Sequence, residues 1–271
     1  MNIQPIVFSI VTPSYNQSAF LEKTISSILQ QDYDNKEFIL IDGGSSDGSL
    51  AIIEKYGKNI DYWISETDNG QVDAIQKGFS TAKGSVFCWL NSDDRFLPGT
   101  LSKVSASIDK NPDAVAWVGD CRLVDEHGHK LRTVKPRELT REGIADWGRK
   151  GWFFQPSCFF SAEAYRTVGG LSDRFHLAFD VELWLKLSEL GKFVIINDVL
   201  SEATIHGDAK TQKQKNEMLS EHIMIQTMYG FDDLAKERIS DLLNQAWLFK
   251  TSKLGRLVGN AFNYIARRVQ K

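Results

Sequence analysis

The sequence is poor in cysteine and has no long apolar run, and each shortage excludes classes of protein. Only three of its 271 residues are cysteines, Cys88, Cys121 and Cys158, and they lie far apart in the chain. Their odd number and their spacing fit neither a disulfide framework nor a zinc or redox motif, so we predict buried free thiols in a reducing compartment. No segment approaches the roughly 20 apolar residues of a transmembrane helix, and the chain does not open with a signal-peptide pattern. We therefore expect a cytoplasmic protein.

The sequence also lacks the two common glycine motifs that bind phosphate. It contains no Gly-x-Gly-x-x-Gly fingerprint and no Gly-Lys-Ser/Thr tripeptide, which argues against a dinucleotide-binding or P-loop protein. A net charge of −3 gives no reason to expect a nucleic acid as a partner. Acidic residues are missing from 242–271, although this tail carries six lysine and arginine residues.

The first hundred residues alternate between strand-like and helix-like segments. Short apolar runs typical of buried strands are separated by segments in which apolar residues recur at helical spacing. Strands joined through helices of about a dozen residues form βαβ units, so we predict an α/β fold with a doubly wound, mostly parallel sheet and helices on both faces. The predicted strands are 6–11, 37–41, 62–65 and 85–90, and the predicted helices are 21–29, 50–56 and 72–82.

The pattern is looser after the first hundred residues, and from about residue 213 the chain becomes helical and amphipathic. We therefore expect one domain over 1–212, with halves 1–100 and 101–212, followed by a helical extension over 213–271. The elements predicted in the second half are helices 101–108, 159–169 and 181–190, strands 115–119 and 193–196, and a hairpin within 121–133.

Acidic side chains follow the predicted strands at the points where they end. In open α/β sheets, ligands bind at the carboxyl ends of the strands. Asp93 and Asp94 follow a buried strand directly, and two adjacent carboxylates there are costly unless a cation meets them. A hard divalent cation that bridges a substrate diphosphate would explain them, whereas the alternative is an ordinary turn or helix cap. The residues that we place at this edge are Tyr15, Asp42, Asp47, Glu66, Asp68, Asp73, Asp93 and Asp94.

The segment 42–48, Asp-Gly-Gly-Ser-Ser-Asp-Gly, ends the second predicted strand. Its glycines permit a tight turn, and the Asp42 carboxylate can only accept hydrogen bonds. Asp42 could accept an N–H from a nucleotide base or a hydroxyl from a ribose. A turn in which Asp42 bonds its own backbone explains the segment equally well.

Four segments together resemble the signature blocks of family 2 glycosyltransferases, which have the GT-A fold. The resemblance covers roughly residues 6–210, with the blocks in the correct order. It implies an inverting transfer of a sugar from a nucleotide-diphosphate sugar, with UDP or GDP as the nucleotide, assisted by Mn²⁺ or Mg²⁺. The four blocks are Thr12-Pro13-Ser14-Tyr15-Asn16, the segment 41–48, the segment 65–78, and Trp89-Leu90-Asn91-Ser92-Asp93-Asp94.

The resemblance also assigns roles to residues on the donor side. Asp93 would bind the metal ion, and Asp42 would accept from the base. Asn91 stands where many relatives have an aspartate, and Gln76 replaces a common asparagine, so the metal affinity or preference could differ from theirs. The residues assigned to nucleotide-sugar binding are Thr12, Pro13, Tyr15, Asn16, Asp42, Glu66, Asp73, Lys77, Asn91, Ser92 and Asp93.

The second half resembles the acceptor side of the same family. The segment 176–184 is similar to an acidic block that carries the catalytic base, which would be Asp180; the alternative is that Asp180 only caps a helix. Trp152 and Gln155 would bind the acceptor sugar by stacking and hydrogen bonding, as would Glu182. His206 resembles a late histidine that reaches the metal or the diphosphate, although a lone histidine is more often an ordinary surface or core residue.

The resemblance therefore implies a glycosyltransferase of cell-surface polysaccharide or lipopolysaccharide assembly, with a glycan or polyprenyl-linked acceptor. The basic tail 242–271 could bind an anionic membrane, which would place the protein at the cytoplasmic face of the inner membrane, or it could pack on protein; the pattern favours neither.

Three alternatives remain open for the whole chain. A nucleotidyltransferase uses similar carboxylates, but it would need a basic, glycine-rich loop that 12–16 does not provide. A glycosidase also uses paired carboxylates, although hydrolysis requires no diphosphate–metal site. A catalytically inactive module that binds nucleotides or sugars is the third.

Overall fold

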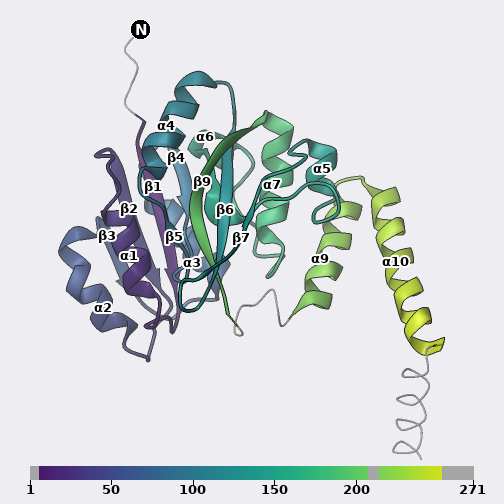
Figure 1. Ribbon diagram of the computed structural model, residues 1–271, viewed down its shortest axis with the longest axis horizontal. Helices are drawn as coiled ribbons and strands as arrows, with labels where there is room; N and C mark the ends of the chain where they lie inside the picture. Colours follow the sequence, from purple (N-terminus) through teal and green to yellow (C-terminus); the bar gives the residue numbers. More distant parts are fainter. Residues whose placement is uncertain (1–5, 207–213, 252–271) are drawn as a thin grey trace, which may run out of the picture. The chain divides into compact units, whose positions relative to one another are not determined.

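A computed structural model of the protein describes residues 6–206 and 214–251 (Figure 1). The chain divides into two compact units, Met1–Met218 and Leu219–Lys271. The roles that we expect for 1–212 and 213–271 stay predictions.

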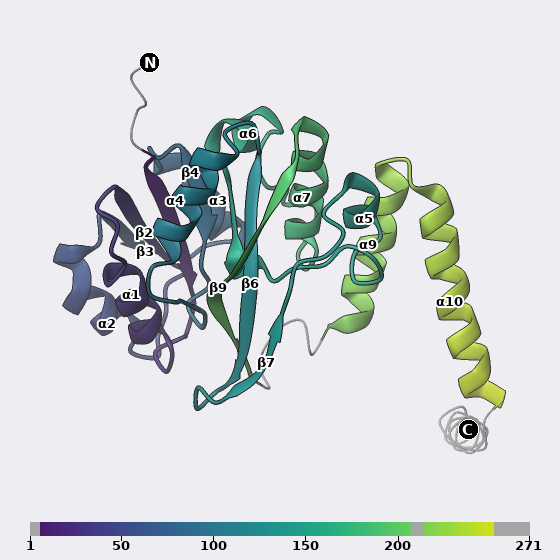
Figure 2. The ribbon, with the colours of Figure 1, turned by 45° about the horizontal axis from the view of Figure 1, so that its top comes forward.

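The described part of the first unit contains a nine-stranded sheet in the order β3-β2-β1-β4-β8-β6-β9-β5, with β7 paired to β6. The strands β3, β2, β1 and β4 are parallel to one another, whereas β4 pairs with β8 in the antiparallel sense. Parallel pairing occurs again between β6 and β9, which lie side by side in Figure 2. The strands are β1 Phe8–Ser14, β2 Lys36–Asp42, β3 Tyr62–Ser65, β4 Val86–Trp89, β5 Arg95–Phe96, β6 Ala116–Asp125, β7 Lys130–Val134, β8 Cys158–Ser161 and β9 Phe193–Ile205.

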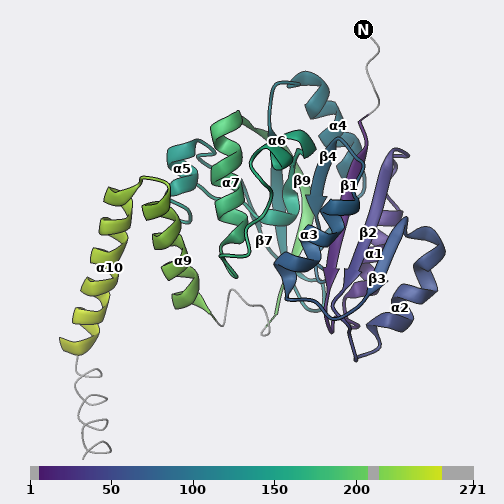
Figure 3. The ribbon, with the colours of Figure 1, turned by 180° about the vertical axis from the view of Figure 1, so that it is seen from behind.

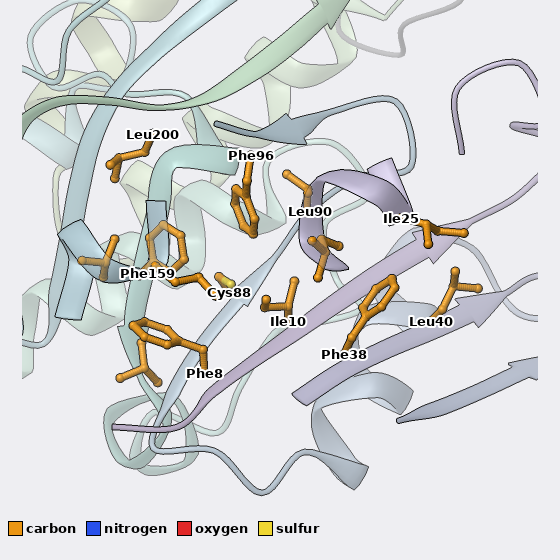
Figure 4. Close-up of a cluster of buried hydrophobic side chains, with 14 of the residues drawn as sticks. Phe8, Ile10, Ile25, Phe38, Leu40, Cys88, Leu90, Phe96, Phe159 and Leu200 are labelled. Atoms are coloured by element: carbon orange, nitrogen blue, oxygen red, sulfur yellow. The ribbon is translucent and has the colours of Figure 1, made fainter. Parts of the chain in front are cut away.

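Alternate residues of the central strands face two different layers of helices, which confirms the predicted α/β, doubly wound architecture. Ile10 and Cys88 belong to the core on one face, where the apolar sides of α1, α2 and α4 pack (Figure 4). Phe87 and Trp89 face the other way and contact rings of α3, α6 and α7. Figure 3 shows these three helices from behind the view of Figure 1. The helices are α1 Leu21–Leu29, α2 Ser49–Tyr56, α3 Gln71–Thr81, α4 Thr100–Lys110, α5 Arg141–Ala145, α6 Ala162–Thr167 and α7 Phe179–Leu190, with short 3₁₀ turns at Gly57–Asn59 and Gln155–Ser157.

The predicted helix 159–169 is partly wrong. Phe159 and Phe160 belong to β8, where they pair with Trp117 and Ala116 of β6. Both rings are fully buried between strands and helices, so this short run gains more from the sheet than from a helical turn. The helix begins only at Ala162, after Ser161 accepts a hydrogen bond from the backbone N–H of Ala164.

Two predicted strands are longer in the structure than in the sequence analysis. The strand predicted for 115–119 and the first arm of the hairpin form one strand, β6, and the hairpin turn itself is confirmed by the β6–β7 pairing. The strand predicted for 193–196 continues to Ile205, since β9 pairs with β6 along its length across register shifts near Gly119 and Asp120.

A charged cluster stabilises β9 where it lies between β5 and β6. The carboxylate of Glu202 bonds Arg95 Nε on one side and Arg122 Nη1, at 2.9 Å, on the other. The Glu202 side chain is 8% exposed, whereas the two arginine side chains are about one-third exposed, at 30% and 34%.

The three cysteines are buried free thiols, as predicted.

The described part of the second unit consists of α9 (Lys215–Met228) from Leu219 onward and of α10 (Asp232–Thr251). Between them, Nδ1 of the buried His222 lies 3.1 Å from Nη1 of Arg238. Burial, followed by the nearby charge of Arg238, lowers the pKa of His222 from 6.5 to about 4. Among the described residues no helix has both the length and the apolar character needed to cross a membrane. Most of the predicted basic tail, 242–271, lies outside the described residues.

Candidate active site

The predicted site residues of the first half meet at one edge of the sheet, because β3, β2, β1 and β4 are parallel neighbours and all end there. Hydrogen bonds join the loop that follows β1 to the loop that follows β2. The backbone N–H of Asn16 donates to Ser45 Oγ at 2.8 Å, and the backbone N–H of Ser46 donates to Asn16 Oδ1 at 2.9 Å. Asn16 has a positive φ of 52°, a conformation that asparagine tolerates better than most residues.

The exposed residues of the first block are Tyr15 and Asn16. Tyr15 is 61% exposed, so its ring is free to meet a ligand. Thr12 and Pro13 belong to β1 itself and are buried, and Thr12 has no exposed surface. Their contact with a nucleotide base stays a prediction. Because both side chains are buried, such a contact would have to use their backbone atoms, or the neighbouring loop would have to move.

Asp42 is a buried turn residue in this structure. Its carboxylate accepts from the backbone N–H groups of Gly44 (3.2 Å) and Ser45 (2.9 Å), and from the hydroxyls of Ser45 (2.5 Å) and Ser65 (2.7 Å). The turn interpretation therefore describes its bonding, and Asp42 also ties the end of β2 to the end of β3. Its predicted role toward the base stays a prediction.

Asp47 anchors the same loop to the start of α2. Partial burial acts to raise the pKa of Asp47, but hydrogen bonds from the backbone N–H of Ser18 and from Ser49 lower it to about 2. Asp47 is thus a charged acceptor that fixes two loops, and its hydrogen bonds are already directed at the protein.

The third block brings together Glu66, Asp73 and Lys77. Lys77 Nζ lies 3.0 Å from Glu66 Oε1 and 3.3 Å from Asp73 Oδ2. The hydrogen bond from Lys77 to Glu66 is the main cause that raises the pKa of Lys77, and the backbone N–H of Asn69 is the main cause that lowers the pKa of Asp73. The first two turns of α3 therefore present an ammonium group and a carboxylate, which pair with each other close to the end of β3.

The fourth block differs in the roles of its two carboxylates. Asp94 is 6% exposed and accepts from the backbone N–H of Thr204 at 3.1 Å. Burial, followed by the charge of Asp93, raises the pKa of Asp94 well above its usual range. The Asn91 amide donates toward Asp94 at 3.4 Å and accepts from Gln71 Nε2 at 2.8 Å, so Asn91 connects α3 with this loop.

Asp93 and His206 lie side by side although 113 residues separate them in the sequence. Asp93 Oδ2 is 3.0 Å from His206 Nε2, and their side chains are 22% and 8% exposed. Thr204, on the same side of β9 as His206, donates its hydroxyl to the carbonyl oxygen of Asp93 at 2.5 Å. The structure thus brings together the two residues that the sequence analysis assigned to a metal.

The separation of the pair fits two ligands of one divalent cation. Two ligands at neighbouring corners of an octahedron with bonds of about 2.1 Å are roughly 3 Å apart, which matches the separation of Asp93 Oδ2 and His206 Nε2. Within residues 6–206 and 214–251, no group of three or more His, Cys, Asp or Glu side chains is arranged to hold a metal ion. Substrate oxygens and water would therefore supply the other ligands, which is usual for Mg²⁺.

The predicted catalytic base lies at the start of α7. Oδ1 of the half-buried Asp180 accepts from the backbone N–H of Val181 at 2.8 Å, while the capping position, Ala178, makes no side-chain cap. Burial raises the pKa of the Cys158 thiol of β8 well above its usual range, and the interactions with Cys88 and then Asp180 act in the same direction. Trp184 of α7 stacks on Trp89 at 5.3 Å, which holds this helix against the end of β4.

Two of the predicted acceptor residues lie near the end of β4 or on α7. Gln155 Nε2 donates to the carbonyl oxygen of Trp89 at 2.7 Å, and Glu182 is buried on α7. Trp152 is half-buried, and its ring contacts those of Trp147 and Phe154 at 5.6 Å and 5.5 Å. The roles of all three residues stay predictions.

Sequence reasoning missed the residues that support the fourth block. They are Thr204, Thr24 of α1, whose hydroxyl is 2.9 Å from the carbonyl oxygen of Ser92 and 2.7 Å from that of Asp94, and Phe20, whose ring stacks on His206. Of these three residues, only Thr204 could have been found from a local sequence pattern, the alternation of residues at the end of β9. Thr204 and His206 alternate with Ala203 and Ile205, which face a small apolar cluster.

Comparison with known proteins relates the chain to one family. The family model described as "Glycosyl transferase family 2" matches residues 9–169. An uncharacterised glycosyltransferase of Mycobacterium tuberculosis is 33% identical over 198 residues, which cover 72% of this chain and 73% of that protein. An uncharacterised glycosyltransferase of Rickettsia conorii is 25% identical over 259 residues, and the match spans 93% of this chain but only 42% of that longer protein. The chondroitin synthase of Pasteurella multocida is 26% identical over 88% of this chain and 24% of its own length.

Two solved structures share the fold. The crystal structure of S. aureus TarS 1–349 in complex with UDP-GlcNAc has a TM-score of 0.64 at 16% identity, and the alignment covers 81% of this chain and 66% of that chain. The mannosyltransferase PcManGT from Pyrobaculum calidifontis, in complex with GDP-Man and Mn²⁺, has a TM-score of 0.64 at 14% identity, with coverage of 99% and 87%. The predicted GT-A type of fold is confirmed by these likenesses.

Proposed function

The chain belongs to glycosyl transferase family 2, and on that premise we propose that it transfers a sugar, with inversion, from a nucleotide-diphosphate sugar to a glycan or lipid-linked glycan. The observation that carries the proposal is the pair of Asp93 and His206 at the carboxyl edge of the sheet, 3.0 Å apart. It lies at the end of β4, next to β1 and two strands from β2, whose loops would take the nucleotide.

The donor would lie along this edge. The exposed Tyr15 offers a ring to the base, and Asp73 and Lys77 offer an acceptor and a cation to the ribose and the diphosphate. The structures of TarS with UDP-GlcNAc and of PcManGT with GDP-Man support a nucleotide-sugar donor. One of these neighbours binds a UDP-sugar and the other a GDP-sugar, so UDP and GDP are the nucleotides to test.

The leaving group is the nucleoside diphosphate, which gains negative charge as the glycosidic bond breaks. Asp93 and His206 would hold Mn²⁺ or Mg²⁺, which supplies electrostatic stabilisation of that charge when bound. Lys77 would contribute a further positive charge from α3. These groups are held by hydrogen bonds before the donor binds, so little reorganisation is needed during the reaction.

Asp180 would act as the general base. The acceptor hydroxyl attacks the anomeric carbon as the bond from that carbon to the diphosphate oxygen breaks, and the hydroxyl proton moves to the Asp180 carboxylate. One direct displacement inverts the anomeric configuration. Trp152, Gln155 and Glu182 are the proposed acceptor contacts, and the relatives named chondroitin synthase and hyaluronan synthase support a polysaccharide as product.

Calorimetry with UDP and GDP, with and without Mn²⁺, tests the donor site. We expect one diphosphate to bind and Mn²⁺ to strengthen its binding; an absence of cation-dependent binding to either would contradict the proposal. A screen of nucleotide sugars by mass spectrometry then identifies the donor. Transfer of the nucleotide rather than the sugar would support a nucleotidyltransferase instead, and binding without any turnover would support an inactive binding module.

The variant Asp180→Asn separates catalysis from binding. We expect it to abolish transfer while the affinity for the nucleoside diphosphate and Mn²⁺ stays unchanged, because the amide cannot take a proton at neutral pH. Transfer at near wild-type rate would show that Asp180 is not the base.

Deletion of 242–271 tests the proposed contact of the tail with the cytoplasmic face of a membrane, and unchanged binding to anionic vesicles would contradict that contact.

A further inference from the structure

We propose that the first turn of α1 positions the cation-binding pair, with Phe20 as the residue that orients the imidazole of His206. This inference rests on the proposed function, since it concerns the cation that Asp93 and His206 would hold. Phe20 acts through its contact with His206, so it is a positioning residue.

The contact between Phe20 and His206 is a stack. The two ring centroids are 5.1 Å apart and the planes are inclined by 26°. One face of the imidazole is therefore covered, and its Nε2 edge points to Asp93 Oδ2 at 3.0 Å. Stacking disfavours rotation of the imidazole about χ2, and such rotation would carry Nε2 away from Asp93.

Phe20 is itself firmly placed. It precedes the first residue of α1, with φ −118° and ψ −34°. Its backbone N–H donates to the carbonyl of Gln17 at 3.0 Å, and its carbonyl oxygen accepts from the backbone N–H groups of Lys23 at 2.9 Å and Thr24 at 3.4 Å. The ring is half-buried. The backbone at Phe20 is thus part of the helical start, and the ring projects from a fixed point.

Thr24 extends the same support to the other ligand. It lies four residues after Phe20, so both side chains project from one face of α1. Thr24 is 1% exposed, and its hydroxyl shares its proton between the carbonyl oxygens of Ser92 (2.9 Å) and Asp94 (2.7 Å), the two neighbours of Asp93. One turn of α1 therefore contacts the loop that carries Asp93 and the imidazole of His206.

This arrangement has the property of an outer-shell support. Residues that hold metal ligands in place typically change metal affinity by 10–100-fold when they are removed. His206 lies one residue after the last residue of β9. A side-chain contact is then the means by which its ring is oriented.

The test measures Mn²⁺ binding directly, by electron paramagnetic resonance of Mn²⁺ titrated into the protein with UDP or GDP and without any sugar. We expect Phe20→Ala to weaken Mn²⁺ about tenfold, and Phe20→Tyr, which keeps the ring, to remain within about twofold of wild type. Phe20→Leu keeps apolar bulk without a ring, so it should behave like Phe20→Ala in affinity while folding more stably.

Leu29→Ala is the matched control, since Leu29 is a partly buried side chain of α1 that packs on the main core. It should lower the melting temperature without changing Mn²⁺ affinity. Equal losses of affinity in Phe20→Ala and Leu29→Ala, or a Phe20→Leu variant that binds Mn²⁺ like wild type, would overturn the positioning role alone. If wild-type protein binds no Mn²⁺ with either diphosphate, the proposed cation site itself fails.

Discussion

Gly78 lies where α3 packs against β1, and replacing it with alanine tests how closely this helix must approach the sheet. A Cβ at Gly78 would be 2.4 Å from Cγ1 and 2.9 Å from Cγ2 of Val11. Carbon atoms in good contact are about 3.5–4.0 Å apart, so α3 or Val11 would have to move by roughly 1 Å. The same helix carries Asp73 and Lys77.

Two opposing effects set the magnitude. Replacing glycine with alanine in a helix interior gains about 1 kcal/mol of helix propensity, whereas overpacking a core typically costs about 1–3 kcal/mol. The contact at 2.4 Å is severe, so we expect the high end of that cost and a net destabilisation of about 1–2 kcal/mol. We also expect weaker binding of the nucleoside diphosphate, because the displaced helix moves Asp73 and Lys77.

A double-mutant cycle with Val11→Ala checks the cause. Val11→Ala removes two buried methyl groups and should cost about 2 kcal/mol alone. In the double variant the new methyl at Gly78 fills part of the space that Val11 leaves, so the two losses should not add, and a favourable coupling of about 2 kcal/mol is expected. Urea denaturation gives the four free energies, and calorimetry gives the four diphosphate affinities.

Ser80→Ala is the control for helix propensity, because Ser80 is exposed on the same helix. It should leave stability unchanged or raise it slightly. The reasoning would be refuted if Gly78→Ala were as stable as wild type, or if the double variant lost the sum of the two single losses.

Three further predictions concern charged and titrating groups. Asp93→Asn should lower Mn²⁺ affinity by more than about 100-fold and Asp94→Asn by about tenfold at most; similar losses in a Mn²⁺ titration would refute the assignment of Asp93 as the ligand. Glu202→Gln should lower the free energy of unfolding by about 2–3 kcal/mol. This loss is below the usual range for a broken buried ion pair because the two arginine partners of Glu202 are partly exposed. A loss under about 1 kcal/mol in urea denaturation would show that solvent already screens the ion pairs. The pKa of His222 falls from 6.5 to about 4 on folding. Above pH 6.5 His222 is neutral in both states and its titration does not affect stability. As the pH falls from 6.5 to 4, His222 becomes protonated in the unfolded state but stays neutral in the folded state. The second unit should thereby lose about 3 kcal/mol, as followed by denaturation at each pH, and a His222→Gln variant with the same slope would contradict this cause.

The sequence was sufficient for the first half of the fold because its signals are local. Each strand from β1 to β4 is a short apolar run, and each is followed by polar or glycine-containing turns and a helix with an apolar face. The carboxyl-edge location of Asp42, Glu66 and Asp93 follows from parallel pairing alone. The order of the four blocks then identified the family, which the comparison with its model confirms.

The second half was harder to predict because its elements depend on distant partners. In β9 the polar residues Asn197 and Asp198 interrupt the apolar pattern, yet the strand continues because β6 lies beside it with shifted register. Phe159 and Phe160 could have begun a helix, and only pairing with β6 and β4 makes them a strand. The stack of Phe20 on His206 joins residues that no local pattern connects.

The distance in sequence between Asp93 and His206 has a consequence for the order of events during synthesis. A ribosome adds about 5–20 residues per second, so the 113 residues between the two take on the order of ten seconds to make. When that interval begins, β1 to β4 have been synthesised; β6 and β8 are made during it, and β9 is complete only at its end. The nascent chain would therefore expose Asp93 at the carboxyl edge of the sheet without His206, and the proposed cation site would be complete only when the strand that ends at Ile205 docks.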